Sequence, residues 1–359
     1  MGEKILMKGN EAIGEAAIRA GCRFFFGYPI TPQNELPEYM SRRLPEVGGV
    51  FLQAESEVAA INMVYGASCA GGRVMTSSSS PGISLKQEGI SYLAGSELPA
   101  VIVNIVRGGP GLGGIQPAQS DYFQATRGGG HGDYRTLVYA PSNIQEMVDL
   151  VMKAFDRADA YRNPVLVLGD GILGQMMEPV EFPDEPPPEP VAKPWATTGA
   201  EGRPPNIISS IILDPELLDK HNWHLMEKYE QIKKKETMWE IYDPYGAEIF
   251  LVAYGTMARV ARAAIESARS RGIDCGLIRP ITLWPFPERA FDELADRAKA
   301  YLSVEMSTGQ MVDDVKIAAA GRAPVYFYGR AGGVVPSPAE IVKKIESIFE
   351  EIKGGSKRA

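Results

Sequence analysis

The residues with the clearest chemical potential lie where a short apolar strand is expected to meet an apolar helix. Residues 51–67 read Phe-Leu-Gln-Ala-Glu-Ser-Glu-Val-Ala-Ala-Ile-Asn-Met-Val-Tyr-Gly-Ala, which places Glu57 in the first turn of that helix. Because the residues after Glu57 are mostly small and apolar, we expect the helix to be buried. A carboxylate in that position can hold a proton or a strong hydrogen bond that bulk water would weaken. Alternatively, Glu55 and Glu57 only favour a helix N-terminus.

Polar residues also follow two other expected strands. The segment 27–32, Gly-Tyr-Pro-Ile-Thr-Pro, holds Thr31 between two prolines and predicts a rigid turn at the carboxyl end of a strand. Open α/β sheets bind their ligands at that end. Arg107 follows the apolar run 100–106 and begins a long glycine-rich loop. Loops of this length inside a domain are usually functional or mobile.

The elements that position these residues alternate between strand and helix. Strands are expected at residues 23–26, 50–52, 73–76, 100–106, 137–139 and 165–168, with helices between most of them. This alternation predicts an α/β fold with a doubly wound, largely parallel sheet, which we assign to residues 1–178.

A second doubly wound α/β domain is expected at residues 246–359, beginning with a strand at 249–253. Residues 179–245 lie between the two domains. They combine a proline-rich linker, which should be extended, with a charged amphipathic helix at about 215–241 that we expect to brace the domains.

Composition argues against several classes of partner. The chain has 359 residues and a formal net charge of −8, and its longest basic run is Lys233 to Lys235. These features disfavour nucleic acid and anionic membranes as main partners. The first residues do not form a signal peptide and no apolar run is long enough to span a membrane, so we expect a cytoplasmic protein.

The sequence predicts neither a metal site nor an iron–sulfur cluster on this chain. Cys22, Cys69 and Cys275 lie far apart, and His221 and His224 have no third ligand nearby. If the protein transfers electrons, the clusters are therefore expected on another chain.

Common catalytic signatures are incomplete. The glycines at 111–116 do not fit the dinucleotide-binding pattern, and no P-loop lysine–serine pair is present. Ser77 to Ser80 lack the GxSxG context of an activated serine. Nucleotide hydrolysis and serine-based catalysis therefore have little support.

Five motifs in order resemble those of the alpha subunits of 2-oxoacid:ferredoxin oxidoreductases. They are Gly-Tyr-Pro-Ile-Thr-Pro at 27–32, Gln-x-Glu-x-Glu-x-Ala-Ala at 53–60, Ser-Ser-Ser-Pro-Gly at 78–82 with its continuation to Pro99, Arg-Gly-Gly-Pro at 107–110, and Arg-Pro-x-Thr-Leu-Trp-Pro-Phe-Pro at 279–287. The resemblance covers essentially the whole chain. It implies a first domain that binds the aminopyrimidine of thiamine diphosphate and a second domain similar to the C-terminal domain of transketolases.

The resemblance also implies partner subunits. A beta subunit would share the thiamine diphosphate, supplying the diphosphate and Mg2+ site, and would carry a [4Fe-4S] cluster. Gamma and delta subunits, ferredoxin-like in character, would complete the path of electrons to ferredoxin. The implied reaction converts a 2-oxoacid and coenzyme A into acyl-CoA and carbon dioxide. The scattered cysteines of this chain agree with clusters that lie elsewhere.

The family motifs imply a role for each matching residue. Glu57 would hydrogen-bond the pyrimidine ring and so promote removal of the thiazolium C2 proton, and Thr31 and Arg107 would hold the substrate. Further contacts to the cofactor are expected from Tyr28, Pro29, Ser79, Ser80 and Gly82. The pocket is expected to include Ile30, Leu112, Ile115 and His131. As alternatives, the serines form an ordinary strand-to-helix turn and Arg107 is a surface anchor.

The sequence favours a branched-chain substrate, 2-oxoisovalerate. The loop after Arg107 lacks an evident cation for the second carboxylate of 2-oxoglutarate, whereas Leu112 and Ile115 suit a branched aliphatic side chain. Segments that resemble the 2-oxoisovalerate members are 193–203, 217–222 and 228–229. 2-Oxoglutarate and pyruvate remain alternatives, because Arg127, Arg135 or a beta-subunit residue could supply the missing charge.

Two other classes of function remain open. A transketolase-like or decarboxylase-like enzyme would carry its own Gly-Asp-Gly motif followed downstream by an Asn. The triplet at 169–171 is Gly-Asp-Gly, but the proline-rich linker follows it. The other class is a non-catalytic scaffold subunit, and the intact set of Thr31, Glu57 and Arg107 argues against it.

Overall fold

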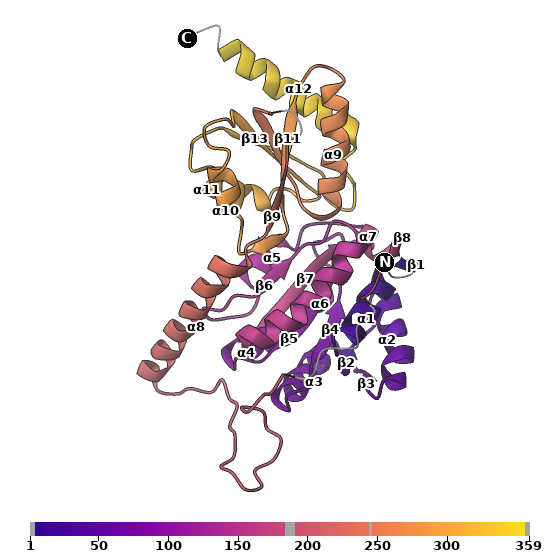
Figure 1. The fold of residues 1–359 in the computed structure, drawn as a ribbon, viewed down its shortest axis with the longest axis vertical. Helices are drawn as coiled ribbons and strands as arrows, with labels where there is room; N and C mark the ends of the chain where they lie inside the picture. Colours follow the sequence, from indigo (N-terminus) through magenta and orange to yellow (C-terminus); the bar gives the residue numbers. More distant parts are fainter. Residues whose placement is uncertain (1–3, 184–190, 244–245, 356–359) are drawn as a thin grey trace.

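A computed structural model describes residues 4–183, 191–243 and 246–355. The chain forms two α/β domains that lie one above the other in Figure 1, with a long helix and an extended segment beside and below the first domain. The described strands form a seven-stranded sheet, a five-stranded sheet and a two-stranded sheet. The fold class expected from the sequence is therefore confirmed.

The seven-stranded sheet organises the first domain. In order across the sheet, its strands are β12 (Thr282–Trp284), β6 (Leu137–Tyr139), β7 (Pro164–Asp170), β5 (Ala100–Val106), β4 (Val74–Ser78), β2 (Phe24–Gly27) and β3 (Val50–Gln53). All neighbouring pairs are parallel except β12 with β6. β4, β5 and β7 are buried along their whole length, as expected for parallel strands covered on both faces.

Two helical layers cover this sheet. One layer contains α1 (Gly9–Arg19), α2 (Glu35–Glu46) and α6 (Ile144–Tyr161), which pack together. The other contains α3 (Glu57–Cys69) and α4 (Pro81–Gly95). The chain reverses its direction across the sheet after β3, so right-handed connections place these two layers on opposite faces. The same topology brings the carboxyl ends of β2, β3, β4 and β5 to one edge of the sheet.

Short elements complete the first domain, and the sequence did not predict them. A two-stranded antiparallel sheet joins β1 (Ile5–Lys8) to β8 (Met177–Val180). Two single-turn helices, α5 (Tyr122–Arg127) and α7 (Gly171–Gln175), follow the glycine-rich loop and β7 respectively. β8 continues past residue 178, the expected limit of the domain.

The second domain is built on the five-stranded sheet. In order, its strands are β14 (Val325–Gly329), β13 (Ala300–Glu305), β10 (Ile249–Val252), β11 (Cys275–Pro280) and the antiparallel edge strand β9 (Trp239–Tyr242). Its helices form two pairs in contact, α9 (Gly255–Arg269) with α12 (Pro338–Gly355), and α10 (Glu288–Asp292) with α11 (Met311–Ala319). α10 has only five residues and α11 has nine.

Two strands cross the domain boundaries drawn from the sequence. The bracing helix α8 (Pro215–Glu236) ends before the expected residue 241, and the chain then forms β9, which belongs to the second sheet. Conversely, β12 follows β11 in the second domain but pairs with β6 in the first. The two domains are therefore interlocked through their sheets.

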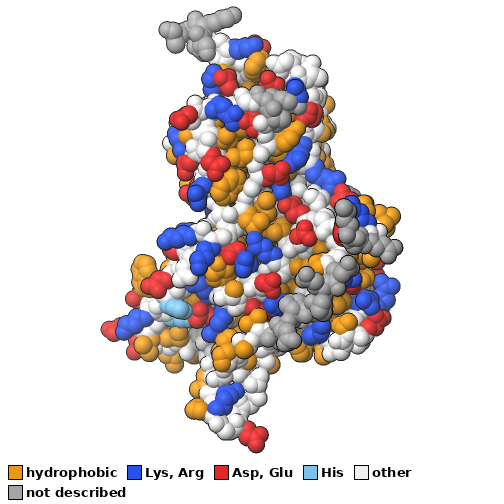
Figure 2. Space-filling view, in the orientation of Figure 1, with side chains coloured by type: hydrophobic (Ala, Val, Ile, Leu, Met, Phe, Trp, Pro, Cys, Tyr) orange, Lys and Arg blue, Asp and Glu red, His pale blue; other side chains and the backbone are white. Residues whose placement is uncertain are grey.

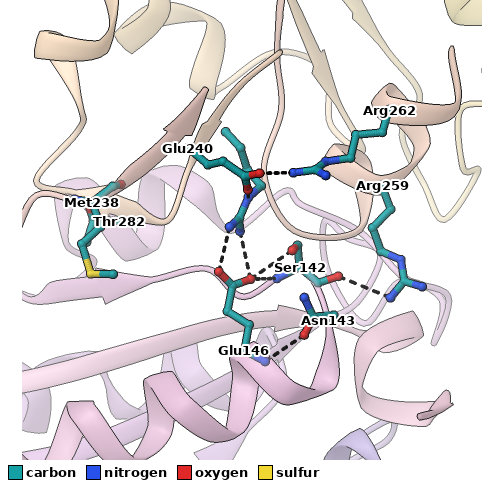
Figure 3. A network of polar contacts seen from close by, with 9 residues as sticks. Ser142, Asn143, Glu146, Met238, Glu240, Arg259, Arg262 and Thr282 are labelled. Carbon is teal, nitrogen blue, oxygen red and sulfur yellow. Dashed lines mark hydrogen bonds and ion pairs between the residues drawn. The ribbon is translucent and has the colours of Figure 1, made fainter. Parts of the chain in front are cut away.

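A polar network joins the domains where these strands cross (Figure 3). The buried guanidinium of Arg279 on β11 donates to both carboxylate oxygens of Glu146 on α6, at 2.8 and 2.9 Å, and to Glu240 on β9 at 2.9 Å. Glu240 also pairs with Arg262 of α9. Arg279 begins the last motif of the family resemblance, and here it ties three elements together.

The surface mixes charges of both signs. Figure 2 shows acidic and basic side chains interspersed over this face of both domains. Among the helices of residues 4–183, 191–243 and 246–355, none has both the length and the apolar character needed to cross a membrane.

Candidate active site

Glu57 begins α3 and its side chain faces the start of α4. The hydroxyl of Ser56 caps α3 by accepting a hydrogen bond from the Ala59 N–H at 3.1 Å, and Glu57 is only 7% exposed. A Cβ atom added to Gly82 would lie 2.7 Å from Glu57 Oε1 and 2.0 Å from Ser78 Oγ. The Glu57 carboxylate, the Ser78 hydroxyl and the backbone of α4 therefore meet at one point, where only glycine fits.

A fully buried lysine lies one helical turn further along α4. The ammonium of Lys86 donates to Thr76 Oγ1 at 2.7 Å and to the Ser77 carbonyl at 2.9 Å. Burial lowers the pKa of Lys86 to about 7, while the charge of Glu57 acts in the opposite direction. Lys86 therefore lies between α4 and β4, one turn of α4 beyond the residue that contacts Glu57.

Several buried polar atoms around this point lack a partner within the described residues. They are Gln33 Nε2, Ser78 Oγ and Ser79 Oγ. Such atoms cost free energy unless something hydrogen-bonds to them. The described chain therefore leaves hydrogen-bonding capacity unused close to Glu57.

A chain of hydrogen bonds places Arg107 beside Thr31. The side chain of Asn104 accepts from the Ser80 N–H at 3.1 Å and donates to Asp121 at 2.9 Å. The Ser80 hydroxyl accepts from the Arg107 N–H at 3.1 Å, and the Arg107 guanidinium donates to the Thr31 carbonyl at 2.8 Å. Burial raises the pKa of Asp121. The Arg107 guanidinium also donates to the Leu112 carbonyl at 3.3 Å, and its Nε is buried without a partner among the described residues.

A hollow of about 660 Å3 lies beside Thr31. Its wall includes Ile115 from the glycine-rich loop, and Ile172 and Met176 near α7. Glu35 is the charged residue among its described lining residues. Burial would raise the pKa of Glu35, but hydrogen bonds from its own N–H, Gln175, Asn10 and Lys8 outweigh burial and lower it.

The structure brings most of the expected site residues to one edge, but not all. Ile30 is half-buried next to Thr31, whereas Tyr28 and Pro29 are exposed on the same turn. Leu112 is 82% exposed and is not part of the lining of the hollow.

His131 lies apart from Glu57. Its ring nitrogen is 3.4 Å from Ser91 Oγ and its ring contacts that of Tyr92 edge-on. Ser91 and Tyr92 follow Gly82 by more than two turns of α4. His131 is therefore not part of the group around the carboxylate.

The Gly-Asp-Gly triplet at 169–171 has a structural role in this chain. Asp170 caps the short helix α7, because its carboxylate accepts hydrogen bonds from the Ile172 and Leu173 N–H groups at 2.9 and 3.3 Å. Burial raises the pKa of this carboxylate. Nor do the described residues place three His, Cys, Asp or Glu side chains together as a metal site.

The two-domain architecture is similar to that of a transketolase. A solved structure of a split-gene transketolase, in an inactive beta4 tetramer, matches with a TM-score of 0.57 over 95% of this chain and 97% of that chain. The two share 13% identity, so this likeness concerns the fold alone.

Family models then identify the chain more closely. The model described as pyruvate flavodoxin/ferredoxin oxidoreductase, thiamine diphosphate-binding, matches residues 15–242, and that of pyruvate:ferredoxin oxidoreductase core domain II matches residues 247–341. The chain belongs to this oxidoreductase family. The family membership expected from the five motifs is confirmed.

Individual relatives match along the whole chain. It is 53% identical over 343 residues to ketoisovalerate oxidoreductase subunit VorB of Methanothermobacter thermautotrophicus, covering 96% of this chain and 97% of the relative. It is 38% identical to 2-oxoglutarate synthase subunit KorA of the same organism, covering 96% and 99%. A solved 2-oxoglutarate:ferredoxin oxidoreductase from Magnetococcus marinus has a TM-score of 0.82 and 27% identity; the match covers 96% of this chain but only 65% of that one.

The residues around Glu57 fit a thiamine diphosphate-binding family. A buried carboxylate, unpartnered hydroxyl groups and a glycine without room for a side chain lie together at the start of α4. Sequence reasoning assigned no role to Lys86, Asn104 or Gln33. The signal for Lys86 was its spacing from Ile83 and Ile90, which places a charge on the apolar face of α4.

Proposed function

We propose that the chain is the alpha-type subunit of a 2-oxoacid:ferredoxin oxidoreductase that oxidatively decarboxylates 2-oxoisovalerate. Coenzyme A would receive the acyl group, carbon dioxide would leave, and ferredoxin would take the electrons. The observation that carries this proposal is the 53% identity to a ketoisovalerate oxidoreductase subunit over nearly the full length of both chains. The 2-oxoglutarate subunit of the same organism is 38% identical.

We expect the chain to act in a complex, since its relatives are named as subunits. A beta subunit would hold the diphosphate, Mg2+ and a [4Fe-4S] cluster, and gamma and delta subunits would pass electrons on. The cytoplasm is the expected location.

Glu57 is the proposed catalytic residue. Thiamine diphosphate, when bound, supplies the electron sink for decarboxylation. The Glu57 carboxylate would hydrogen-bond the pyrimidine nitrogen and assist proton transfer there, and its burial strengthens such a bond. Gly82 lets Glu57 and Ser78 approach the backbone of α4 closely, while Ser79 and Ser80 line the same turn.

Arg107 and Thr31 are proposed to hold the substrate carboxylate. The bond from Arg107 to the Thr31 carbonyl fixes the guanidinium, and the free Nε can add a hydrogen bond to an anion. Thr31 is one of the residues that line the adjoining hollow. We place the branched end of the substrate in this hollow.

The lining of the hollow supports a branched aliphatic side chain. Ile115, Ile172 and Met176 offer apolar contacts. The charge of Glu35 is paired with Lys8, and no described lining residue would neutralise the second carboxylate of 2-oxoglutarate.

The proposal can be tested with the purified complex that contains this chain. Under anaerobic conditions, coenzyme A-dependent viologen reduction would be measured with 2-oxoisovalerate, 2-oxoglutarate and pyruvate. We expect the highest kcat/KM with 2-oxoisovalerate. Glu57→Gln should lower kcat by roughly 10²–10⁴, the usual contribution of a positioned acid or base.

Each result has a definite reading. Preference for 2-oxoglutarate would retain the family reaction and reject the substrate assignment. Full activity of the Glu57→Gln complex would reject the role of Glu57 and the location of the cofactor. Absence of any 2-oxoacid oxidation by an intact complex would favour a scaffold subunit instead.

A further inference from the structure

The Glu57 carboxylate is buried without direct support. Its side chain forms no hydrogen bond or ion pair with any residue in the described part of the chain. Burying an ionised carboxylate is unfavourable unless an opposite charge or a hydrogen-bond donor compensates it. A buried cation close to Glu57 would supply this compensation.

The elements packed against Glu57 contain few charged groups. α3 contacts β2, β4 and α4, and neither strand carries a charged side chain. On α4 the charged residues are Lys86 and Glu88. Glu88 is exposed and its carboxylate accepts a hydrogen bond from Tyr92, so it faces solvent and not Glu57.

Lys86 is placed to supply the compensating charge. It is completely buried, and Glu57 is the ionisable residue whose charge acts on it. Its two hydrogen bonds go to Thr76 Oγ1 and the Ser77 carbonyl, and no described carboxylate forms a direct ion pair with it. An ammonium has three donors, so one N–H remains for a further contact.

The support for Lys86 is itself fixed by the sheet. Thr76 donates its hydroxyl hydrogen to the Phe26 carbonyl on β2 at 2.6 Å, so its oxygen is oriented to accept from the lysine. The Ser77 hydroxyl hydrogen-bonds to Gln33. Lys86 therefore ties α4 to β4 directly, and Thr76 extends the connection to β2.

We propose that Lys86 is a positioning residue for Glu57, a buried cation whose charge holds this carboxylate in the orientation that thiamine diphosphate requires. The inference rests on the proposed function, because it assigns Glu57 to the cofactor. It adds a residue that acts through Glu57 and need not touch the cofactor or the substrate.

The protonation of Lys86 gives the proposal a signature that does not depend on activity. Its pKa is about 7 in the folded protein, against the usual 10.5. Between these values the unfolded chain binds more protons than the folded one, so folding stability rises with pH over this range. Lys86→Met should remove this contribution from the dependence of stability on pH.

The test compares two variants of the intact complex. Lys86→Met removes the charge and the hydrogen bonds, whereas Lys86→Gln retains donors for Thr76 and Ser77 but removes the charge. Lys228→Met is the matched control, because Lys228 is half-buried and also has a lowered pKa, but it pairs with Glu97, away from Glu57. The readouts are the Kd of thiamine diphosphate for the cofactor-depleted complex and the pH profile of kcat.

We expect both Lys86 variants to bind thiamine diphosphate about tenfold more weakly, as loss of a charge-assisted network predicts. The acid limb of kcat should move to higher pH, while the KM for 2-oxoisovalerate stays unchanged. The control should retain the wild-type Kd and profile.

Two outcomes would overturn the inference. If Lys86→Gln restores the wild-type Kd and pH profile, the lysine is only a structural hydrogen-bond donor. If both variants match the wild type, Lys86 has no part in the site. A wild-type complex that neither binds nor needs thiamine diphosphate would instead reject the proposed function, so the two failures are distinguishable.

Discussion

Gly82 determines how closely Glu57 and Ser78 approach the backbone of α4. Most glycines in a helix weaken it, because their backbone loses more freedom on folding than that of alanine. At this position the missing side chain leaves the space that Glu57 Oε1 and Ser78 Oγ occupy. The position of the Glu57 carboxylate therefore depends on the absence of a Cβ atom at residue 82.

Gly82→Ala should disturb the packing of Glu57 and Ser78 against α4. Its Cβ would lie 2.0 Å from Ser78 Oγ, so the serine, Glu57 or α4 must move. We expect the affinity for thiamine diphosphate to fall at least about tenfold, since overpacking a buried site costs about 1–3 kcal/mol. Titration of the cofactor-depleted complex measures this change.

Gly95→Ala is the matched control on the same helix. Its nearest neighbouring atom would be 3.6 Å away, an ordinary contact, so stability should stay the same or rise by up to about 1 kcal/mol. Equal effects of the two substitutions would show that Gly82 has no special role.

Residue patterns indicated Glu57, Thr31 and Arg107, but not the polar residues that hold them. Asn104 lies within the apolar run 100–106, whose pattern predicts only a buried strand. In the structure it is buried on β5, and its amide links the Ser80 turn to Asp121. A single polar residue in an apolar run has many explanations, and only tertiary contacts decide among them.

At the scale of elements, Arg279 ties α6, β9 and β11 together (Figure 3). Its guanidinium is shared between two carboxylates, each from a different part of the chain. Such a fork has a geometry that lysine cannot reproduce. The contact therefore fixes how the second sheet sits on the first domain.

Arg279→Met should destabilise the chain by about 3–5 kcal/mol, because it leaves the Glu146 carboxylate without its buried partner. Arg271→Met is the comparison, since Arg271 is half-exposed in its pair with Glu346 and should contribute less than about 1 kcal/mol. Urea unfolding of each variant gives the free energies. Similar losses for both would argue against a special role of the Arg279 network.

The same network predicts a loss of stability in acid. Burial tends to raise the pKa of Glu240, but the hydrogen bonds and charges of Arg279 and Arg262 outweigh it and lower this pKa from 4.5. The stabilisation is present above the unfolded value of 4.5 and is lost as pH falls through the lower folded value. Glu240→Gln should flatten this acid dependence in thermal unfolding, and an unchanged curve would contradict it.

The sequence predicted the long elements well and the short ones poorly. The parallel strands and the helices between them have clear apolar patterns. β9 and β12 have only four and three residues and lack a pattern of their own. Their pairing is decided by tertiary contacts, such as the backbone bonds from Ile281 and Thr282 to the Met238 carbonyl.

At the scale of the whole molecule, the two domains share strands and cannot be divided cleanly between them. A fragment that ends at residue 245 would lack β12 and leave β6 as an open edge. We expect faster amide hydrogen exchange at Leu137–Tyr139 in this fragment than in the full chain, since edge strands open more readily. Equal protection would mean that β12 does not support the first sheet.

The position of β12 also has a consequence for synthesis of the chain. The strands of the seven-stranded sheet come from residues as early as Phe24 and as late as Trp284. A ribosome must therefore release most of the polypeptide, including β10 and β11 of the other sheet, before the first sheet can close. During that interval β6 has a free edge, and incomplete sheets of this kind are prone to aggregate. The nascent chain is thus expected to depend on chaperones until residue 284 has emerged.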